Sequence, residues 1–279
     1  MAMRKLYISA DIEGCAGVAS QHALAADRFE WQDARRWMTN EVVAAAEAAL
    51  AHGYDEVLVV DGHGNGHNLL PDAMPDRVRL LRSWPRALLQ MEGIDEPGIE
   101  AAFFIGYHNG AMGDGGVLAH TYSSAAFRDL RLNGVSASEG YLNAALAGEF
   151  GVPVVLVTGD AETAADARRY APGGEACIVK QSVGFRAAAA LTPREACAAI
   201  RTAAASALAV PRPEPFRLQG PYRLEIDFST RVAAEMAAYL PFVEQTGPIT
   251  VAAEFPTMTA LMRFISFLIL FNPNGVVGL

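Results

Sequence analysis

Short apolar runs alternate with longer amphipathic segments along the first part of the chain. Residues 6–10, 57–60 and 101–105 have the length and composition of buried strands. Apolar residues recur at three- to four-residue spacing over residues 31–52, and Gly53 follows, which predicts a helix that ends at a glycine cap. A strand, a helix and a strand in this order predict a right-handed βαβ unit with parallel strands.

The same alternation continues further along the chain. We expect strands at residues 78–81, 130–135 and 152–158, with an irregular strand or hairpin at the second of these. A helix is expected over residues 138–149. Another helix should begin at Thr192, because a capping threonine is followed by proline at the first helical position and glutamate at the third.

A cluster of prolines predicts a boundary within the chain. Prolines occur at positions 211, 213, 215 and 221. After them the pattern predicts a strand, a helix, a strand and an apolar helix, at residues 223–228, 230–239, 249–253 and 257–271. We therefore expect an α/β fold, with a mainly parallel sheet flanked by helices, over residues 1–210. A smaller C-terminal α+β domain, residues 211–279, would pack on the first domain or mediate oligomerisation.

Each of the first three strong strands is followed by residues that can bind a metal ion. Asp11 and Glu13 follow the first strand, His63 follows the second, and His108 follows the third. In an open α/β sheet, ligands bind outside the carboxyl ends of the strands, so these groups can converge on one crevice. Carboxylates together with imidazoles indicate a divalent metal site, which makes hydrolysis the first functional hypothesis.

Each of these residues also has a purely structural interpretation. Asp11 and Glu13 point to one side of an extended segment and can reach one cation, or they can belong to a solvated turn. A single histidine such as His63 or His108 is more often a hydrogen-bonded structural residue. Asp61 can hold an imidazole in one tautomer or can cap a turn.

Three other residues complete the set of candidates. Glu139 lies three residues after Ser136, which is the spacing of a capping box at a helix start. A role as a metal ligand is the alternative. His120 can serve as a general base, as a hydrogen-bond donor to a transition state, or as an ordinary buried histidine. His67 shares a loop with His63 and is a weaker candidate.

Several motifs of other enzyme classes are missing from the sequence. The glycine-rich stretch at residues 62–68 lacks the spacing of a dinucleotide-binding or phosphate-binding loop. Neither Gly-x-Ser-x-Gly nor His-Glu-x-x-His occurs. A metal-activated water molecule is therefore the nucleophile that the sequence supports best.

Composition narrows the choice of partners and location. The formal net charge is −9, from 22 basic and 31 acidic side chains without a Lys/Arg cluster, which argues against nucleic acid and membrane partners. The three cysteines form no Cys-x-x-Cys pair, so neither a disulfide framework nor a thiolate zinc site is indicated. No signal-peptide pattern is visible, and the strongly apolar stretch 264–271 is too short to span a bilayer. We therefore expect a cytoplasmic protein.

With these residues in view, the chain resembles the M55 family of D-aminopeptidases. The family signature Ser-x-Asp-x-Glu-Gly is present at residues 9–14. Asp61-Gly62-His63, Gly106-Tyr107-His108, His120 and Glu139 then follow in the order of the family. The resemblance extends from the N-terminus to about Ala260.

The resemblance implies a binuclear zinc site and a role for each candidate. Asp11 would bridge two zinc ions, with Glu13 and His63 on one and His108 and Glu139 on the other, and His120 would be the catalytic residue. Manganese or cobalt would suit the same ligands. The resemblance also implies a self-compartmentalising ring, decameric in the prototype. Substrates of the family are short peptides with an N-terminal D-amino acid, especially D-alanine.

Two alternative functions stand beside this one. The first is a different binuclear metallohydrolase, such as an amidase or a phosphoesterase, and the second is a non-catalytic protein that binds a metal or a small molecule. His120 favours catalysis, because a binding-only site needs no proton-transfer group. The chain departs from the family at Ala119, His67 and Arg186, and residues 272–279 have no counterpart in it.

Overall fold

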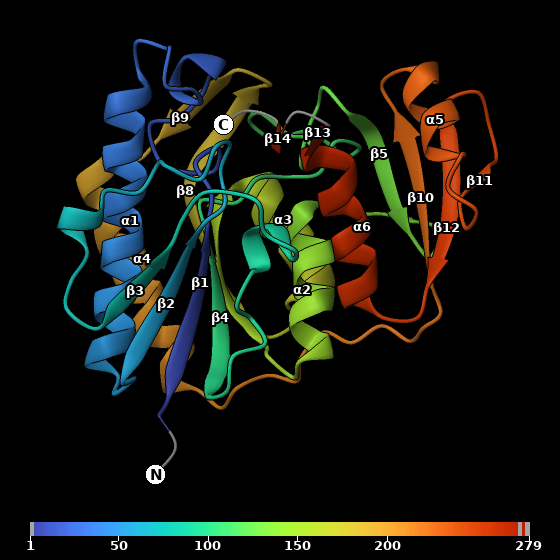
Figure 1. Cartoon of the computed structure of the whole chain (residues 1–279). Coiled ribbons are helices and arrows are strands. Elements are labelled where there is room, and N and C mark those ends of the chain that lie inside the picture. The colour runs from blue at the N-terminus through green and yellow to red at the C-terminus, as the bar shows by residue number, and fades with distance from the viewer. Residues whose placement is uncertain (1–2, 273–274, 277–279) are drawn as a thin grey trace.

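The structure is a computed structural model that describes residues 3–272 and 275–276 (Figure 1). A seven-stranded sheet forms its centre, and six of the strands run parallel, with only β9 antiparallel to its neighbour. In sheet order, the strands are β3 (Val78–Leu81), β2 (Glu56–Asp61), β1 (Lys5–Ala10), β4 (Ile99–Ile105), β7 (Val154–Asp160), β8 (Glu175–Gly184) and β9 (Ala187–Ala190).

Helices cover both faces of this sheet (Figure 1). One face carries α1 (Trp31–Ala51) and α4 (Pro193–Ala209), and the other carries α2 (Glu139–Glu149) and α3 (Ala161–Tyr170). Because successive side chains of a strand point to opposite faces, Leu6 and Ile8 of β1 pack towards α1 and α4, whereas Tyr7 packs with the α2 side. Burial on both faces explains the continuous apolar runs in the sequence.

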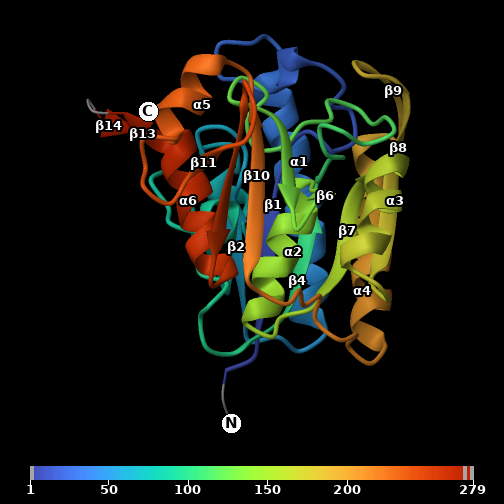
Figure 2. The same cartoon turned by 90° about the vertical axis from the view of Figure 1, so that its right-hand side faces the viewer.

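A second, antiparallel sheet lies beyond α2 (Figure 2). Its order is β11 (Glu244–Gln245), β12 (Thr250–Phe255), β10 (Tyr222–Phe228), β5 (Phe127–Leu132) and β6 (Val135–Ser136). The helix α5 (Arg231–Ala237) packs on β10 and β12, and α6 (Met258–Leu270) packs against α2. Ten of the eleven residues of α2 are buried, because the helix is enclosed by both sheets and their helices.

The structure confirms the predicted α/β class, with a mainly parallel sheet flanked by helices. The hairpin expected at residues 130–135 is the pair β5–β6. The division of the chain at residue 211 stays a prediction. The antiparallel sheet contains strands from both sides of that residue, since Leu132 of β5 pairs with Leu224 of β10. The pattern analysis did not predict α3, β8 or β9, and the four alanines of β9 have a low preference for strands.

Over residues 3–272, no helix is both long and apolar enough to cross a membrane. The tail at residues 272–279, to which the sequence assigns no function, lies largely outside the described residues.

A close contact between α2 and the connection to the antiparallel sheet gives the first testable prediction. A Cβ atom at Gly148 of α2 would lie 1.8 Å from the carbonyl oxygen of Phe216. Helix propensity alone would make Gly148→Ala stabilising by about 1 kcal/mol. We expect overpacking to reverse the sign, so the variant should lose about 1–3 kcal/mol of unfolding free energy in urea. A variant more stable than the wild type would contradict this contact.

Candidate metal centre

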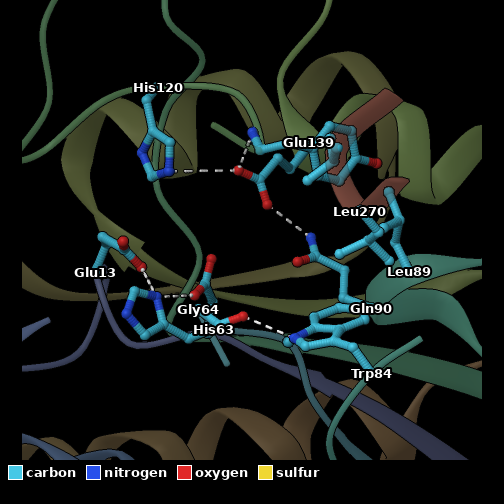
Figure 3. A pocket seen from close by; sticks show the side chains of 13 residues that line it. Glu13, His63, Gly64, Trp84, Leu89, Gln90, His120, Glu139 and Leu270 are labelled. Atoms are coloured by element: carbon cyan, nitrogen blue, oxygen red, sulfur yellow. Dashed lines mark hydrogen bonds and ion pairs between the residues drawn. The ribbon is translucent and has the colours of Figure 1, made fainter. Parts of the chain in front are cut away.

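The six residues predicted from the sequence meet at the carboxyl edge of the parallel sheet. Figure 3 labels Glu13, His63, His120 and Glu139 among them. Asp11 and Glu13 follow β1, and His63 lies two residues after β2. His63 Nδ1 lies 3.2 Å from Asp11 Oδ1 and 2.9 Å from Glu13 Oε2. The first two strand ends therefore place two carboxylates and one imidazole around a single point.

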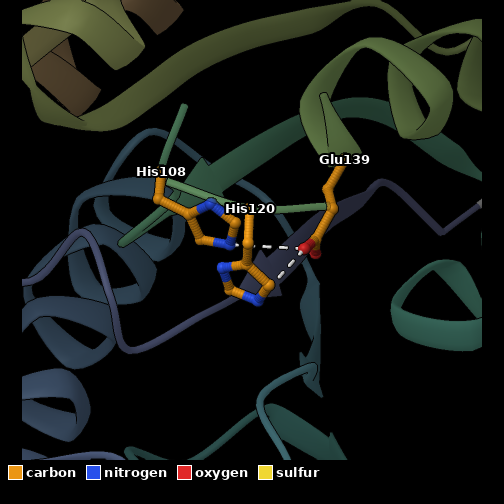
Figure 4. A group of neighbouring side chains, drawn as sticks. All are labelled: His108, His120 and Glu139. Carbon is orange, nitrogen blue, oxygen red and sulfur yellow. Dashed lines mark ion pairs between the residues drawn. The ribbon is translucent and has the colours of Figure 1, made fainter. Parts of the chain in front are cut away.

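The third strand end and α2 bring together a second group (Figure 4). His108 Nε2 lies 3.3 Å from Asp11 Oδ2 and 3.3 Å from Glu139 Oε1. His120 Nε2 lies 3.9 Å from the same oxygen of Glu139. The rings of His108 and His120 are stacked, with centroids 4.2 Å apart and planes inclined by 9°.

Asp11 connects the two groups. Its Oδ1 faces His63 and its Oδ2 faces His108, so one carboxylate reaches both sides. Within each group, the candidate ligand atoms lie within 4.8 Å of one another; the groups are Asp11, Glu13 and His63, and His108, His120 and Glu139. This arrangement suits two cations that share one carboxylate. The assignment of individual ligands remains a prediction.

The three histidines are held so that one ring nitrogen of each faces the centre. The other ring nitrogen lies 2.8–2.9 Å from a backbone carbonyl: Leu24 for His63, Asn109 for His108 and Leu118 for His120. A carbonyl oxygen only accepts hydrogen bonds, so that nitrogen must carry the proton. When the inward nitrogen gives up its proton, its lone pair points to the centre, and the ring is then in the tautomer that binds a metal ion.

The donor set fits a metal ion. Glu13 Oε2 and His108 Nε2 are buried, and neither makes a hydrogen bond of good geometry among the described residues, although their histidine and carboxylate neighbours lie only 2.9–3.3 Å away. A buried polar atom left without a partner costs about 1–3 kcal/mol, so such atoms in a folded protein need an explanation. Cations bound at the two groups would satisfy both atoms.

The protonation of the centre depends on its mixed charges. Burial alone would lower the pKa of both imidazoles, but the charge of Glu13 raises the pKa of His63 well above its usual value, and Glu139 does the same for His108. Burial raises the pKa of Asp11, yet the two imidazoles outweigh it and hold that pKa well below its usual range. A metal ion must displace the imidazole protons, so loading should weaken as the pH falls.

Gly14, the last residue of the signature, is required by a close approach of two backbones. Gly14 N donates a 2.8 Å hydrogen bond to Gly106 O, and a Cβ atom at Gly14 would lie 1.9 Å from Tyr107 O. The turn that carries Asp11 and Glu13 thus packs directly against the turn that carries His108. Only glycine allows this approach without a shift of the backbone.

The capping-box interpretation of Glu139 was wrong. Ser138 is the residue that caps α2, and its side chain accepts a hydrogen bond from Tyr141 N at 3.1 Å. Glu139 is the first helical residue, and its carboxylate points into the centre instead. Its Oε2 accepts a hydrogen bond from Gln90 Nε2 at 2.9 Å, and its Oε1 accepts one from Tyr122 N at 2.6 Å.

Two other candidates have structural roles. Asp61 accepts hydrogen bonds from the backbone of Asn68 and Leu69, so it caps the turn, and its carboxylate is not the partner of the His63 imidazole. His67 is outside both groups, and its Nδ1 lies 3.3 Å from Arg82 Nη2.

The sequence analysis did not predict a buried lysine beneath the first group. Lys180 of β8 is 2% exposed, and its ammonium donates to the carbonyls of Glu13, Cys15 and Val18. Burial lowers the pKa of this ammonium. A single lysine in a strand carries no signal for such a contact. Lys180 fixes the backbone of Glu13 and so aims its carboxylate at the centre.

Comparison with known proteins gives the family. Residues 3–267 match the Peptidase_M55 family model, which is described as D-aminopeptidase. The chain belongs to this family. It is 30% identical over 249 residues to a D-aminopeptidase of Bacillus subtilis (strain 168), a match that covers 88% of this chain and 90% of the relative.

A solved structure agrees with this membership. It is described as the Zn-dependent D-aminopeptidase DppA from Bacillus subtilis, a self-compartmentalizing protease. The two folds superimpose with a TM-score of 0.90 at 28% identity, over 95% of this chain and 96% of the other. The predicted family and fold are therefore confirmed, and they extend over the antiparallel sheet as well as the parallel one.

The position of Glu139 at the start of α2 gives the second prediction. We expect Glu139→Gln to weaken zinc binding strongly, because the amide oxygen lacks the charge that faces His108. Ser138→Ala is the matched control, since it removes the actual cap and should cost about 1 kcal/mol of stability without loss of zinc. Zinc content by mass spectrometry and unfolding in urea separate the two effects. Full zinc occupancy in Glu139→Gln would exclude Glu139 as a ligand.

Lys180 gives the third prediction. Lys180→Met removes the donor to three carbonyls, and we expect zinc affinity to fall by about 10–100-fold, as for other groups that hold a ligand in place. Titration against a chromophoric chelator measures the affinity. Gly148→Ala, destabilised far from the centre, serves as the control for stability alone. Equal zinc affinity in Lys180→Met and wild type would show that Lys180 does not position the first group.

Proposed function

We propose that this protein is a zinc-dependent aminopeptidase that releases N-terminal D-amino acids of the D-alanine type from short peptides. The observation that carries the proposal is the position of Asp11, whose two carboxylate oxygens face separate histidine–carboxylate groups. Membership in a family of D-aminopeptidases supports the reaction. The zinc dependence of its Bacillus subtilis neighbour supports the metal.

We assign the first zinc ion to Glu13 and His63 and the second to His108 and Glu139, with Asp11 shared. Ions held by these residues would supply Lewis acidity for the scissile carbonyl and for the attacking water molecule. The buried carboxylates of Asp11, Glu13 and Glu139 would keep the histidines oriented and offset part of the cationic charge.

His120 is the group assigned to proton transfer. Its side chain is 21% exposed and lines the cavity, so it can reach a substrate. The hydrogen bond from Nδ1 to Leu118 O leaves Nε2 free to accept a proton and to pass it to the leaving amine. Leu118 and Tyr122, two residues before and after His120, have positive φ angles of 58° and 56°. Residues other than glycine rarely adopt this backbone conformation, and such strain is common at functional sites.

The alternative functions have less support. Enzymes that act on phosphate esters surround the phosphate with arginine, lysine or backbone donors, and no described residue that lines the cavity is basic apart from histidine. A binding-only protein has no need of His120 beside the metal centre. Peptide hydrolysis, in which a neutral carbonyl is attacked, needs no such cluster of basic residues.

We also propose that the chain associates with copies of itself into a ring, and the family resemblance suggests ten subunits. We propose the cytoplasm as its location. The neighbour DppA is described as self-compartmentalizing. Exposed apolar side chains suitable for such association are present on and just after α5, where Val232, Met236 and Tyr239 are 67%, 59% and 76% exposed. The absence of a Lys/Arg cluster in the sequence is consistent with a protein that binds peptides and not nucleic acids.

The fourth prediction concerns metal and proton transfer. Removal of zinc with a chelator should abolish cleavage of D-alanine p-nitroanilide, and added zinc should restore it. His120→Ala should lower kcat by about 10²–10⁴-fold, since it removes a general acid–base, with zinc content unchanged. L-alanine p-nitroanilide is the control substrate. Equal cleavage of both substrates would contradict the D-specificity, and full activity of His120→Ala would remove this residue from the mechanism.

A further inference from the structure

The cavity above the metal centre is small and has two unlike sides. Its volume is about 160 Å³, below the range of about 300–1,000 Å³ typical of sites for drug-sized ligands, so it suits a single amino-acid residue. One side carries the acidic and histidine residues of the metal centre. The other lining residues with large apolar side chains are Trp84, Leu89, Tyr122, Ile269 and Leu270, which we call the apolar wall. Figure 3 labels Trp84, Leu89 and Leu270 of this wall.

Trp84 is fixed in place at this wall. Its indole Nε1 donates a 2.7 Å hydrogen bond to Gly64 O, in the loop that follows His63. The guanidinium carbon of Arg86 lies 3.6 Å from the centroid of its ring. Because Nε1 already has an acceptor, the indole offers a ligand only its apolar surface.

Arg86 keeps its charge away from the cavity. Its side chain is 6% exposed, its Nη2 donates to Asp61 O at 2.7 Å, and it does not line the cavity. Among the described residues that line the cavity, none is lysine or arginine. A carboxylate placed against the apolar wall would therefore lose water and find no lysine or arginine beside it among the described residues that line the cavity.

We infer that the apolar wall binds the side chain of the substrate's N-terminal residue, selects neutral aliphatic side chains and rejects acidic ones. This inference rests on the proposed peptidase function. With the scissile carbonyl at the metal centre, the side chain of the N-terminal residue that carries this carbonyl must occupy the remaining space, and that space is bounded by Trp84 and Leu89. Trp84 and Leu89 are thus specificity-determining residues to which the sequence assigned no role.

The test uses hydroxamates of D-leucine, D-alanine and D-aspartate, because this head group binds zinc whether or not a peptide is cleaved. Calorimetry on the zinc-loaded full chain gives their dissociation constants. We expect D-leucine hydroxamate to bind more tightly than D-alanine hydroxamate, and D-aspartate hydroxamate to bind at least about 10-fold more weakly than D-leucine hydroxamate. Equal binding of the aspartate and leucine compounds would overturn the inference.

The decisive variant is Trp84→Ala. It should weaken binding of D-leucine hydroxamate by about 10-fold and binding of D-alanine hydroxamate much less, since only the larger side chain reaches the ring. Equal losses for both compounds would show that Trp84 acts only through the metal centre, which contradicts the inference. Zinc content, expected to stay at the wild-type level, is recorded alongside.

Tyr54→Leu provides a matched control. Tyr54 also carries an arginine over its ring, Arg4 at 4.8 Å, but it lies at the opposite end of the parallel sheet from the centre. We expect it to leave the ratio of leucine to alanine affinities unchanged. Failure of the wild type to cleave any D-aminoacyl substrate would reject the proposed function, whereas an unchanged ratio in Trp84→Ala with cleavage intact would reject only the apolar wall.

Discussion

The arrangement of the site depends on one carboxylate that faces histidines from two different strand ends. Asp11 Oδ1 lies 3.2 Å from His63, and Asp11 Oδ2 lies 3.3 Å from His108. These contacts exist because β1 lies between β2 and β4 in the parallel sheet, so the residue that follows β1 is adjacent to both neighbours. The glycine at position 14 lets the turns after β1 and β4 touch.

Around Asp11, backbone carbonyls do much of the positioning. Backbone carbonyl oxygens accept hydrogen bonds from the three imidazoles and so orient them. Three more backbone carbonyls accept hydrogen bonds from the ammonium of Lys180. Side chains then complete the support, as Gln90 does for Glu139. A metal centre held in this way depends on the surrounding loops as much as on its ligands, and this is why changes outside the ligand set should alter zinc affinity.

The sequence predicted five of the seven strands of the parallel sheet and the residues that meet at its edge, because buried strands have apolar runs and polar residues mark their ends. The pattern alone left Glu139 open between a capping residue and a metal ligand, because a serine three residues earlier gives the spacing of a capping box, whereas Ser138 is the cap. The roles of Lys180 and Trp84 were not predictable, because they arise from contacts between residues far apart in the chain. The pairing of β5 with β10 escaped prediction for the same reason.

The most direct test of the central claim is anomalous X-ray scattering at the zinc edge from crystals of the zinc-loaded protein. The account predicts two zinc peaks, one near Glu13 and His63 and one near His108 and Glu139, with the carboxylate of Asp11 between them. A single peak, or two peaks of which only one is in contact with Asp11, would contradict a shared carboxylate as the basis of the centre.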